Sequence, residues 1–169
     1  AAVSDGLLIK GGGHAMAAGL TLARDKLPAL KAFFSRRLEG ATSAARDAAA
    51  LDIDGALTPR AVNDELIDLI ERAGPFGQGN PQPRFVFPAH RLKGLRVMND
   101  AHIRVSLEAA DGARIDAVAF RCVGSPLGDA LLGANGLPLH VAGHLRRDSW
   151  GGREKIEVMI EDVADPRSQ

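Results

Sequence analysis

The spacing of apolar residues divides the chain into a helical part and a strand-rich part. From residue 24 to residue 38 they recur every three or four positions, which predicts an amphipathic helix that ends near Gly40. The small, Ala-rich residues 41–50 extend this helix or connect it to the next element. Thr58 before Pro59 predicts an N-cap and the first position of a second helix. The buried stripe expected on that helix is Val62, Leu66, Leu69 and Ile70.

Beyond residue 84 the apolar residues alternate, as they do in half-buried strands. Asp111-Gly112 predicts a hairpin turn, and residues 126–132 suit a short helix. The expected strands are 84–87 continuing through 91–98, 102–107, 114–120, 139–146 and 154–163, with a shorter one at 51–55. Five strands with a helix between the third and the fourth predict an α+β chain ending in an OB-fold-like barrel, with a generic five-stranded sandwich as the alternative.

Two glycine-rich segments stand out. Gly74–Pro83 holds three glycines and three prolines, so it continues neither a helix nor a central strand. Its ordered mixture of residues predicts a shaped hinge rather than a flexible linker. The hinge residues we single out are Phe76, Gly77, Gly79 and Asn80. The other segment, Gly11, Gly12, Gly13 and His14, lets a ligand approach the backbone and predicts an anion site, although a tight turn is the simpler alternative. It matches neither G-x-G-x-x-G nor a Walker motif.

Charge is balanced overall but clustered locally. The 169 residues carry 21 basic and 21 acidic side chains, which argues against a strongly basic nucleic-acid binder. Two basic clusters nevertheless follow residue 83: Arg84, Arg91, Lys93, Arg96 and Arg104, and then Arg146, Arg147 and Arg153 around Trp150. The single cysteine, Cys122, excludes an internal disulfide and fits a reducing cytoplasm. No apolar run is long enough to cross a membrane. Because the chain does not begin with Met, we expect it to be a piece of a longer protein.

The basic side chains are expected to lie on one face of the sheet. Strand alternation puts His102 and Arg104 opposite Ile103, and likewise places His144 and Arg146 away from the core. Such a face beside an aromatic loop residue predicts single-stranded DNA binding, and a merely solvated polar face is the alternative. The residues predicted to contact DNA are Arg84, His102, Arg104, His144, Arg146, Arg147, Trp150 and Arg153.

The sequence holds no evident catalytic or metal-binding set. His140 and His144 are four residues apart on an expected strand, about 13 Å, which is too far for one ion. The carboxylates of the second helix, Asp64, Glu65, Asp68 and Glu71, are expected to form a solvated face. No catalytic residue and no metal ligand is therefore predicted within this chain.

Three motifs together resemble a known family. They are Gly11–Gly19, the Pro75-Phe76-Gly77-Gln78-Gly79-Asn80-Pro81 hinge, and Trp150–Arg153 followed by Val158–Val163. In this order they resemble the C-terminal half of the RecJ family, single-strand-specific 5′→3′ DNA exonucleases of the DHH phosphoesterase superfamily, active in DNA repair and recombination. The first motif alone is shared across DHH-associated domains. The hinge before an OB-like domain points to RecJ.

The resemblance implies a division of labour between two halves of an enzyme. A DHH domain, whose Asp-His-His motif this chain lacks, would hold two divalent metals, Mn²⁺ or Mg²⁺. Gly11, Gly12, Gly13 and His14 would hold substrate phosphates, and the OB-like domain would close around single-stranded DNA. The implied segments are 1–40, the end of a DHH-associated domain, 41–83, a helical connector with the hinge, and 84–169, the OB-fold domain.

From this resemblance we expect a monomeric chain that is inactive alone, with replication or repair proteins as further partners. Two alternatives stay open. One is a DHH-family phosphodiesterase acting on short oligonucleotides, which the lack of a barrel after residue 84 would favour. The other is a non-enzymatic OB-fold interaction module.

Overall fold

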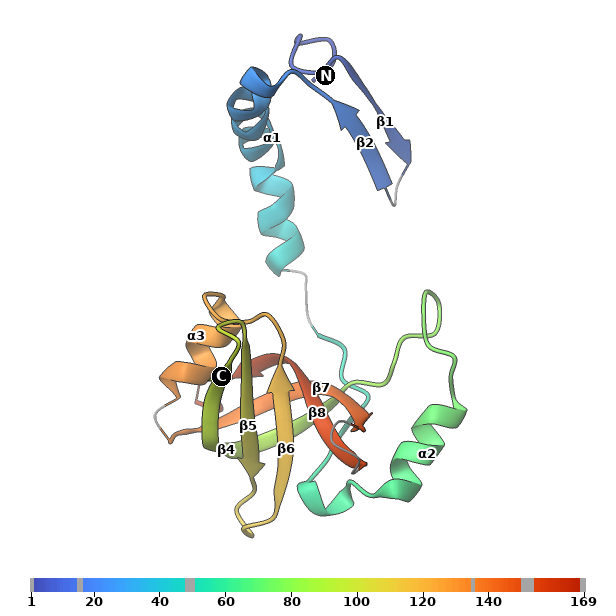
Figure 1. The fold of residues 1–169 in the computed structure, drawn as a ribbon, viewed down its shortest axis with the longest axis vertical. Coiled ribbons are helices and arrows are strands. Elements are labelled where there is room, and N and C mark those ends of the chain that lie inside the picture. Colours follow the sequence, from blue (N-terminus) through green and yellow to red (C-terminus); the bar gives the residue numbers. More distant parts are fainter. Residues whose placement is uncertain (1, 15–16, 48–50, 135, 150–153, 168–169) are drawn as a thin grey trace. The chain divides into compact units, whose positions relative to one another are not determined.

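The chain folds as two compact units, residues 1–51 and residues 52–169. The structure, a computed structural model, describes residues 2–14, 17–47, 51–134, 136–149 and 154–167. The first unit consists of strands β1 (Lys10–His14) and β2 (Ala17–Thr21), the 3₁₀ turn η1 (Arg24–Lys26) and helix α1 (Leu27–Asp47) (Figure 1). None of the helices in the described ranges is long and apolar enough to cross a bilayer.

Helix α1 is longer than its apolar spacing predicts. The expected stop at Gly40 is wrong, because the helix continues to Asp47. Alanine is the strongest helix former, and the Ala-rich residues after Gly40 offset the roughly 1 kcal/mol that an interior glycine costs. The question left open for residues 41–50 is thus decided in favour of a helix extension as far as Asp47.

The second unit begins with short elements that lead to helix α2 (Asp64–Arg72). Strand β3 (Gly55–Ala56) pairs with the start of the barrel, and Pro59–Ala61 form the 3₁₀ turn η2. Thr58 is the N-cap residue of η2 and Pro59 its first residue, as predicted, but this turn ends at Ala61 and is not the start of α2. Helix α2 has its own N-cap, Asn63, whose side chain accepts a hydrogen bond from the Leu66 amide.

The buried side of α2 also differs from the expected stripe. Ile67 and Ile70 are buried, whereas Leu69 is exposed. Leu66, Ile67 and Ile70 lie at the three- and four-residue spacing that puts side chains on one side of a helix, and Leu69 lies on another side. Leu66 and Val62 pack against the core as partly buried residues.

Five strands and one helix form the barrel that the alternation predicts. They are β4 (Phe85–Met98), β5 (His102–Glu108), β6 (Arg114–Ala119), α3 (Pro126–Gly133), β7 (Pro138–Asp148) and β8 (Lys155–Ala164). The sheet runs β4-β5-β6-β8-β7, and β4 also pairs with β7, which closes it. Only β6 and β8 run parallel within this ring. The OB-like barrel is confirmed over the sandwich alternative.

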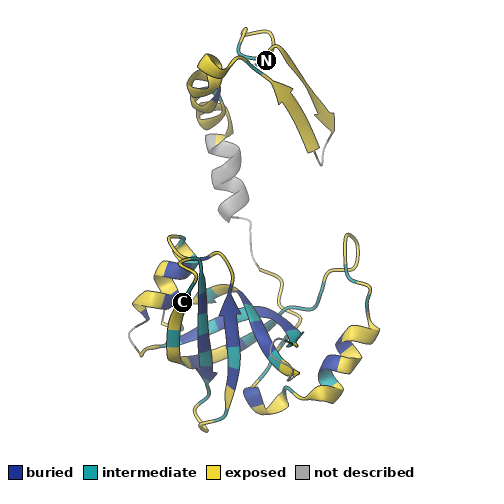
Figure 2. Cartoon of the chain, viewed as in Figure 1, coloured by how far each residue is buried: buried dark blue, intermediate teal, exposed yellow. Residues whose placement is uncertain are grey.

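Alternation along the strands builds the core of the barrel. In β5 every second residue, Ile103, Val105 and Leu107, is buried, and their neighbours face outwards (Figure 2). These side chains join Phe87, Val141 and Val158 in one cluster, against which α2 and α3 pack. The predicted Asp111-Gly112 turn is confirmed, with Gly112 at φ 79°. At residue 125 a serine caps α3, whose first residue is Pro126.

Candidate nucleic-acid interface

The outward side of β5 lies within a band of basic side chains. His102 and Arg104 alternate with the buried residues, as the pattern predicts. On β4, a register shift between Lys93 and Arg96 brings Arg96 directly opposite Arg104. Two arginines on one sheet face repel each other, so this pairing costs stability unless acidic groups lie close by.

A buried carboxylate offsets this repulsion between arginines. Glu157 on β8 is 2% exposed, and its two oxygens accept hydrogen bonds from Arg104 Nη2 (3.1 Å) and Arg146 Nε (2.8 Å). Asp148 lies 3.5 Å from Arg104 as well. The side chains of both arginines remain about one-third exposed (31% for Arg104 and 37% for Arg146), although Nε of Arg104 is buried and has no hydrogen-bond partner. The arginines are therefore held in fixed positions, yet water or a ligand still reaches them.

An exposed aromatic ring completes this band, and sequence reasoning missed it. Phe120, directly after β6, is 42% exposed. The guanidinium carbon of Arg146 lies 4.9 Å from its ring centroid, within cation–π range, and the ring of His102 is 5.3 Å away in an edge contact. The alternation along β6 was the available signal. Phe120 is an even number of residues from Arg114 and Asp116, which are not buried, and an odd number from the buried Ile115 and Ala117.

His102 belongs to the band through its edge contact with the ring of Phe120. Its Nδ1 accepts a hydrogen bond from the Arg121 amide (2.8 Å), which fixes the orientation of the imidazole ring. We name the set Arg96, His102, Arg104, Phe120 and Arg146 the outer face.

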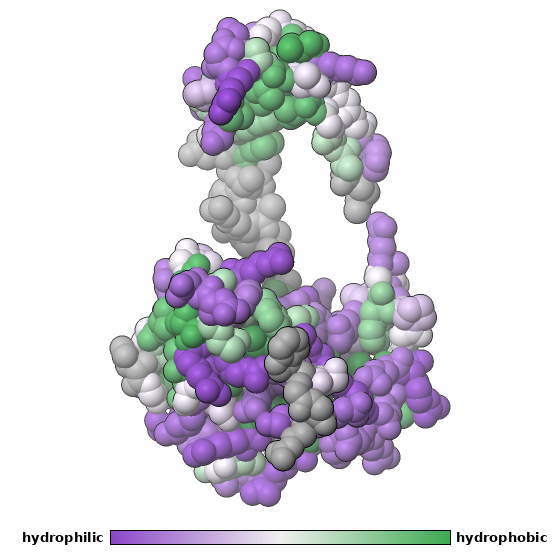
Figure 3. Space-filling view, viewed as in Figure 1, coloured by the Kyte–Doolittle hydropathy of each residue, from purple (hydrophilic) through white to green (hydrophobic). Residues whose placement is uncertain are grey.

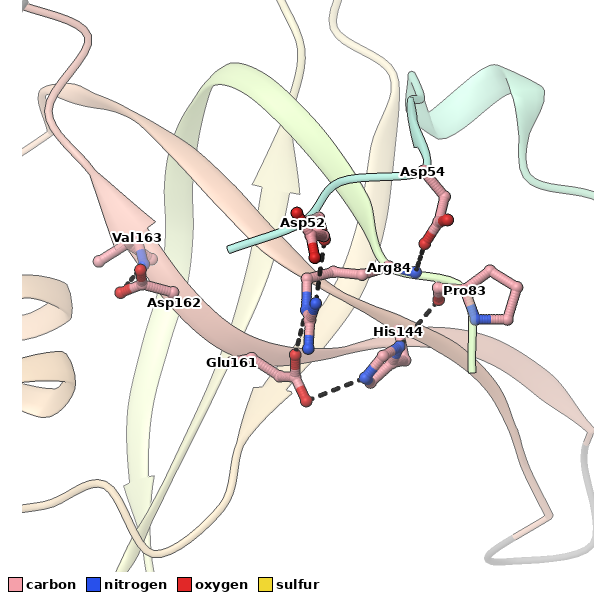
Figure 4. A network of polar contacts seen from close by, with 8 residues as sticks. All are labelled: Asp52, Asp54, Pro83, Arg84, His144, Glu161, Asp162 and Val163. Atoms are coloured by element: carbon pink, nitrogen blue, oxygen red, sulfur yellow. Dashed lines mark hydrogen bonds and ion pairs between the residues drawn. The ribbon is translucent and has the colours of Figure 1, made fainter. Parts of the chain in front are cut away.

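Two other predicted DNA contacts, Arg84 and His144, belong to a separate network (Figure 4). Arg84 donates to Glu161 from Nε (2.6 Å) and to the Asp52 carbonyl from Nη1 (2.9 Å). The ring nitrogens of His144 lie 2.8 Å from the Pro83 carbonyl and 2.9 Å from Glu161. Partial burial acts to raise the pKa of Glu161, but Arg84 and His144 outweigh it and hold that pKa below its usual value. These contacts join the residue 52–54 segment and the end of the hinge to the barrel.

Arg147 is turned towards helix α2. It forms ion pairs with Asp64, Asp68 and Glu71 on this helix, and the surface over α2 is largely hydrophilic (Figure 3). Desolvation acts to lower the pKa of Arg147, but these carboxylates outweigh it, and the net shift is upward. Arg147 thus holds α2 against β7. Trp150 and Arg153 lie outside the described residues.

The predicted phosphate-binding segment is one strand of a hairpin. Gly11, Gly12 and Gly13 pair with β2 in antiparallel register, and none of them has a positive φ. A Cβ at Gly13 would lie 2.5 Å from the Ala17 carbonyl oxygen, so the close approach of the two strands requires glycine there. The three glycines and His14 are exposed.

The hinge is an ordered turn. Asn80 donates from Nδ2 to the carbonyls of Ala73 and Pro75, both at 3.1 Å, and its backbone pairs with Gly77. Gly79, at φ 88°, occupies the left-handed position of this turn. Phe76 packs against the barrel core. The described residues bring no three His, Cys, Asp or Glu side chains together as a metal site.

The chain is similar to proteins of one family over nearly its whole length. A family model described as the RecJ OB domain matches residues 53–162. The single-stranded-DNA-specific exonuclease RecJ of Escherichia coli is 30% identical over 94% of this chain, and the RecJ of Bacillus subtilis is 25% identical over 90%. These alignments cover 27% and 19% of the two relatives, so the chain spans about a quarter of their length or less.

Solved structures agree with this result. The crystal structure of RecJ in complex with Mn²⁺ from Thermus thermophilus has a TM-score of 0.58 and 25% identity, covering 98% of this chain and 23% of that one. The corresponding Mg²⁺ complex has a TM-score of 0.57 at 24% identity, with 98% and 24% covered. The barrel, the family model and these relatives lead to one conclusion: the chain belongs to the RecJ family, and residues 53–162 match its OB domain.

Proposed function

We propose that the protein containing this chain is a single-strand-specific 5′→3′ DNA exonuclease of DNA repair and recombination that uses Mn²⁺ or Mg²⁺. This chain contributes DNA binding, and the metal ligands belong to another part of the protein. The observation that carries the proposal is the outer face, where three arginines and one exposed aromatic ring gather on an OB barrel. Phosphates meet arginines and bases meet aromatic rings when OB folds hold single strands.

Electrostatics support this end of the sheet as the path of the strand. Within the described part of the chain, the acidic partners of Arg104 and Arg146 are Glu157 and Asp148, so these two acids and the three arginines, Arg96 included, sum to one positive charge. At the far end of the same face Glu108 is paired with Arg114 and lies 3.7 Å from Lys93. Because the excess is small, we expect weak binding with a modest slope of log affinity against log salt, roughly −1 to −2.

The remaining predicted contacts have supporting roles in this proposal. Gly11, Gly12, Gly13 and His14 hold substrate phosphates in the whole protein, where the exposed hairpin meets the DHH domain. The division into 1–40, 41–83 and 84–169 stays a prediction, as do the cytoplasmic location, the monomeric state and the repair-protein partners. The side chains of Arg84, His144 and Arg147 are less exposed (26%, 10% and 24%) than those of Arg104 and Arg146, so their direct contribution to DNA binding is smaller than that of the outer face.

A fluorescence anisotropy titration of this chain with a labelled single-stranded oligonucleotide at low salt tests the proposal. Combined Arg104→Ala and Arg146→Ala should remove most binding and flatten the salt slope by about 1.4, at 0.7 for each phosphate that is no longer neutralised. Arg114→Ala is the matched control, since this arginine lies on the same sheet but at its far end. The proposal fails if wild type does not bind at low salt, or if the double variant binds as well as wild type.

We also propose that the chain alone does not cleave DNA. Incubation of end-labelled single-stranded DNA with the purified chain and Mn²⁺ should leave the substrate intact. Manganese-dependent cleavage that co-purifies with the chain and disappears in a His14→Ala variant would contradict this.

The alternatives fare differently. A phosphodiesterase for short oligonucleotides would have been favoured by the lack of a barrel after residue 84. The structure has a barrel there, so this alternative loses its support. A protein-interaction module without DNA affinity predicts no binding in the titration above, so the same experiment separates it from the proposed function.

A further inference from the structure

Phe120 and its neighbours form a small site with chemistry of its own. The residue directly precedes the Arg121 turn, and the residues around it, Val118, Ala119 and Cys122, are all buried. A phenylalanine left 42% exposed among buried neighbours presents a flat apolar surface to solvent. Its ring does not move freely, because His102 contacts it and Arg146 lies over it.

Arg146 is itself fixed in place. Its Nε and one Nη2 hydrogen donate to Glu157, which uses two of the five N–H donors of the guanidinium and leaves three. Glu157 is buried and also holds Arg104, so one carboxylate sets the position of both arginines. A prepositioned arginine loses little conformational freedom when a ligand arrives.

We infer that Phe120 and Arg146 form a stacking site for a single unpaired nucleobase, with Glu157 as the residue that positions the arginine. The inference rests on the proposed function and adds a specific binding site to it. A flat heteroaromatic ligand matches the exposed phenyl ring and the guanidinium plane, both of which stack with bases. Arg104, tied to the same carboxylate, lies where an adjoining phosphate can be met.

The site selects unpaired bases of any identity. Within a duplex both faces of a base are covered by its neighbours, so duplex DNA offers nothing to stack on Phe120. A phenyl ring reads no hydrogen-bond pattern, and stacking tolerates every base. Single-strand preference in the OB barrel therefore arises at this site, whereas the arginines alone attract any polyanion.

A pair of oligonucleotides tests the inference directly. Wild-type chain is titrated with a labelled deoxythymidine oligomer of about a dozen residues, within the size range of OB sites, and with an abasic oligomer of equal length and charge. The abasic strand should bind roughly 5- to 150-fold more weakly, which is the range for loss of a base–aromatic stack. Phe120→Ala should bind the thymidine oligomer as weakly as wild type binds the abasic one, with an unchanged salt slope.

Two further variants separate loss of the Phe120 ring from a general loss of folding. Phe120→Leu keeps the apolar contact without the ring and should behave like Phe120→Ala. Phe34→Ala removes a phenylalanine of comparable exposure, 38%, in the first unit and should bind like wild type. If wild type binds no oligomer, the proposed function itself fails. If wild type binds both oligomers equally, or if Phe120→Leu binds like wild type, the stacking site is refuted while DNA binding stands.

Discussion

Replacement of Glu157 by glutamine gives the sharpest test of how the outer face is held together. Gln keeps the size of the side chain but removes the charge that Arg104 and Arg146 share. Hydrogen bonds to charged groups contribute about 1.5–3 kcal/mol each, so counting one for each of the two arginines gives roughly 3–6 kcal/mol. Both arginines are about one-third exposed, and water partly replaces the lost partner, so we expect a loss of roughly 2–4 kcal/mol.

Thermal unfolding followed by circular dichroism measures this loss. For a unit of this size 1 kcal/mol corresponds to about 4 °C, so the midpoint of the barrel transition should fall by roughly 8–16 °C. Glu154→Gln is the matched control, because Glu154 is largely exposed and 3.9 Å from its nearest arginine nitrogen. Its midpoint should change by no more than about 2 °C.

A triple variant separates the lost pairing from general damage. Arg104→Met, Arg146→Met and Glu157→Leu together remove every charge of the cluster, and such replacements are often neutral for stability. The triple variant should regain most of the stability that Glu157→Gln loses. If Glu157→Gln unfolds within about 2 °C of Glu154→Gln, the buried carboxylate is not what holds the arginines, and the account of the outer face is wrong.

Three other predictions concern barrel residues outside the outer face. Gly143→Ala places a Cβ 2.1 Å from the Met159 carbonyl oxygen and should cost about 2–3 kcal/mol in denaturant unfolding, whereas Gly133→Ala, with open space, should cost nothing. Arg147→Ala removes the ion pairs to three exposed carboxylates of α2, so the α2 amides should exchange faster at low salt and change little at about 1 M salt; unchanged hydrogen exchange in α2 at low salt would contradict this. The pKa of Glu161 is lower in the folded chain than its ordinary value of 4.5. The ionised carboxylate therefore stabilises the fold at pH values above 4.5, and this contribution is lost as the pH falls through the pKa of the folded state. The wild-type midpoint should therefore exceed that of Glu161→Gln at about pH 6, and the difference should shrink as the pH is lowered below 4.5; a difference independent of pH would refute the linkage.

Local patterns in the sequence predict most of the barrel. Strict alternation in residues 102–107 predicts which side chains are buried, because a half-buried strand has a period of two. The Asp111-Gly112 turn and the start of α3 at Pro126 follow from turn and helix-start chemistry in the same way. The hairpin of β1 and β2 was harder to predict, because glycine is depleted in strands and the pairing depends on close approach at Gly13.

The composition of the candidate site depends on contacts that the sequence does not reveal. Arg104 is a plausible DNA contact by its alternation, but its pairing with Glu157 joins positions 53 residues apart. Arg147 follows Arg146 directly, yet it faces α2, 83 residues from Asp64. Phe120 was overlooked because strand alternation separates faces and does not identify the outward residue that lies beneath Arg146. Such tertiary pairings decide which basic residues remain available to a ligand.

The most direct test of the account is a map of amide chemical-shift changes by NMR on this 17.8 kDa chain as a deoxythymidine oligomer is added. We predict that the largest changes cluster on the outer face, at Arg96, His102, Arg104, Phe120 and Arg146, and leave α2 unchanged. Changes centred on α2 or on the far end of the sheet at Glu108 and Arg114, or no changes at low salt, would contradict the assignment of this face to single-stranded DNA.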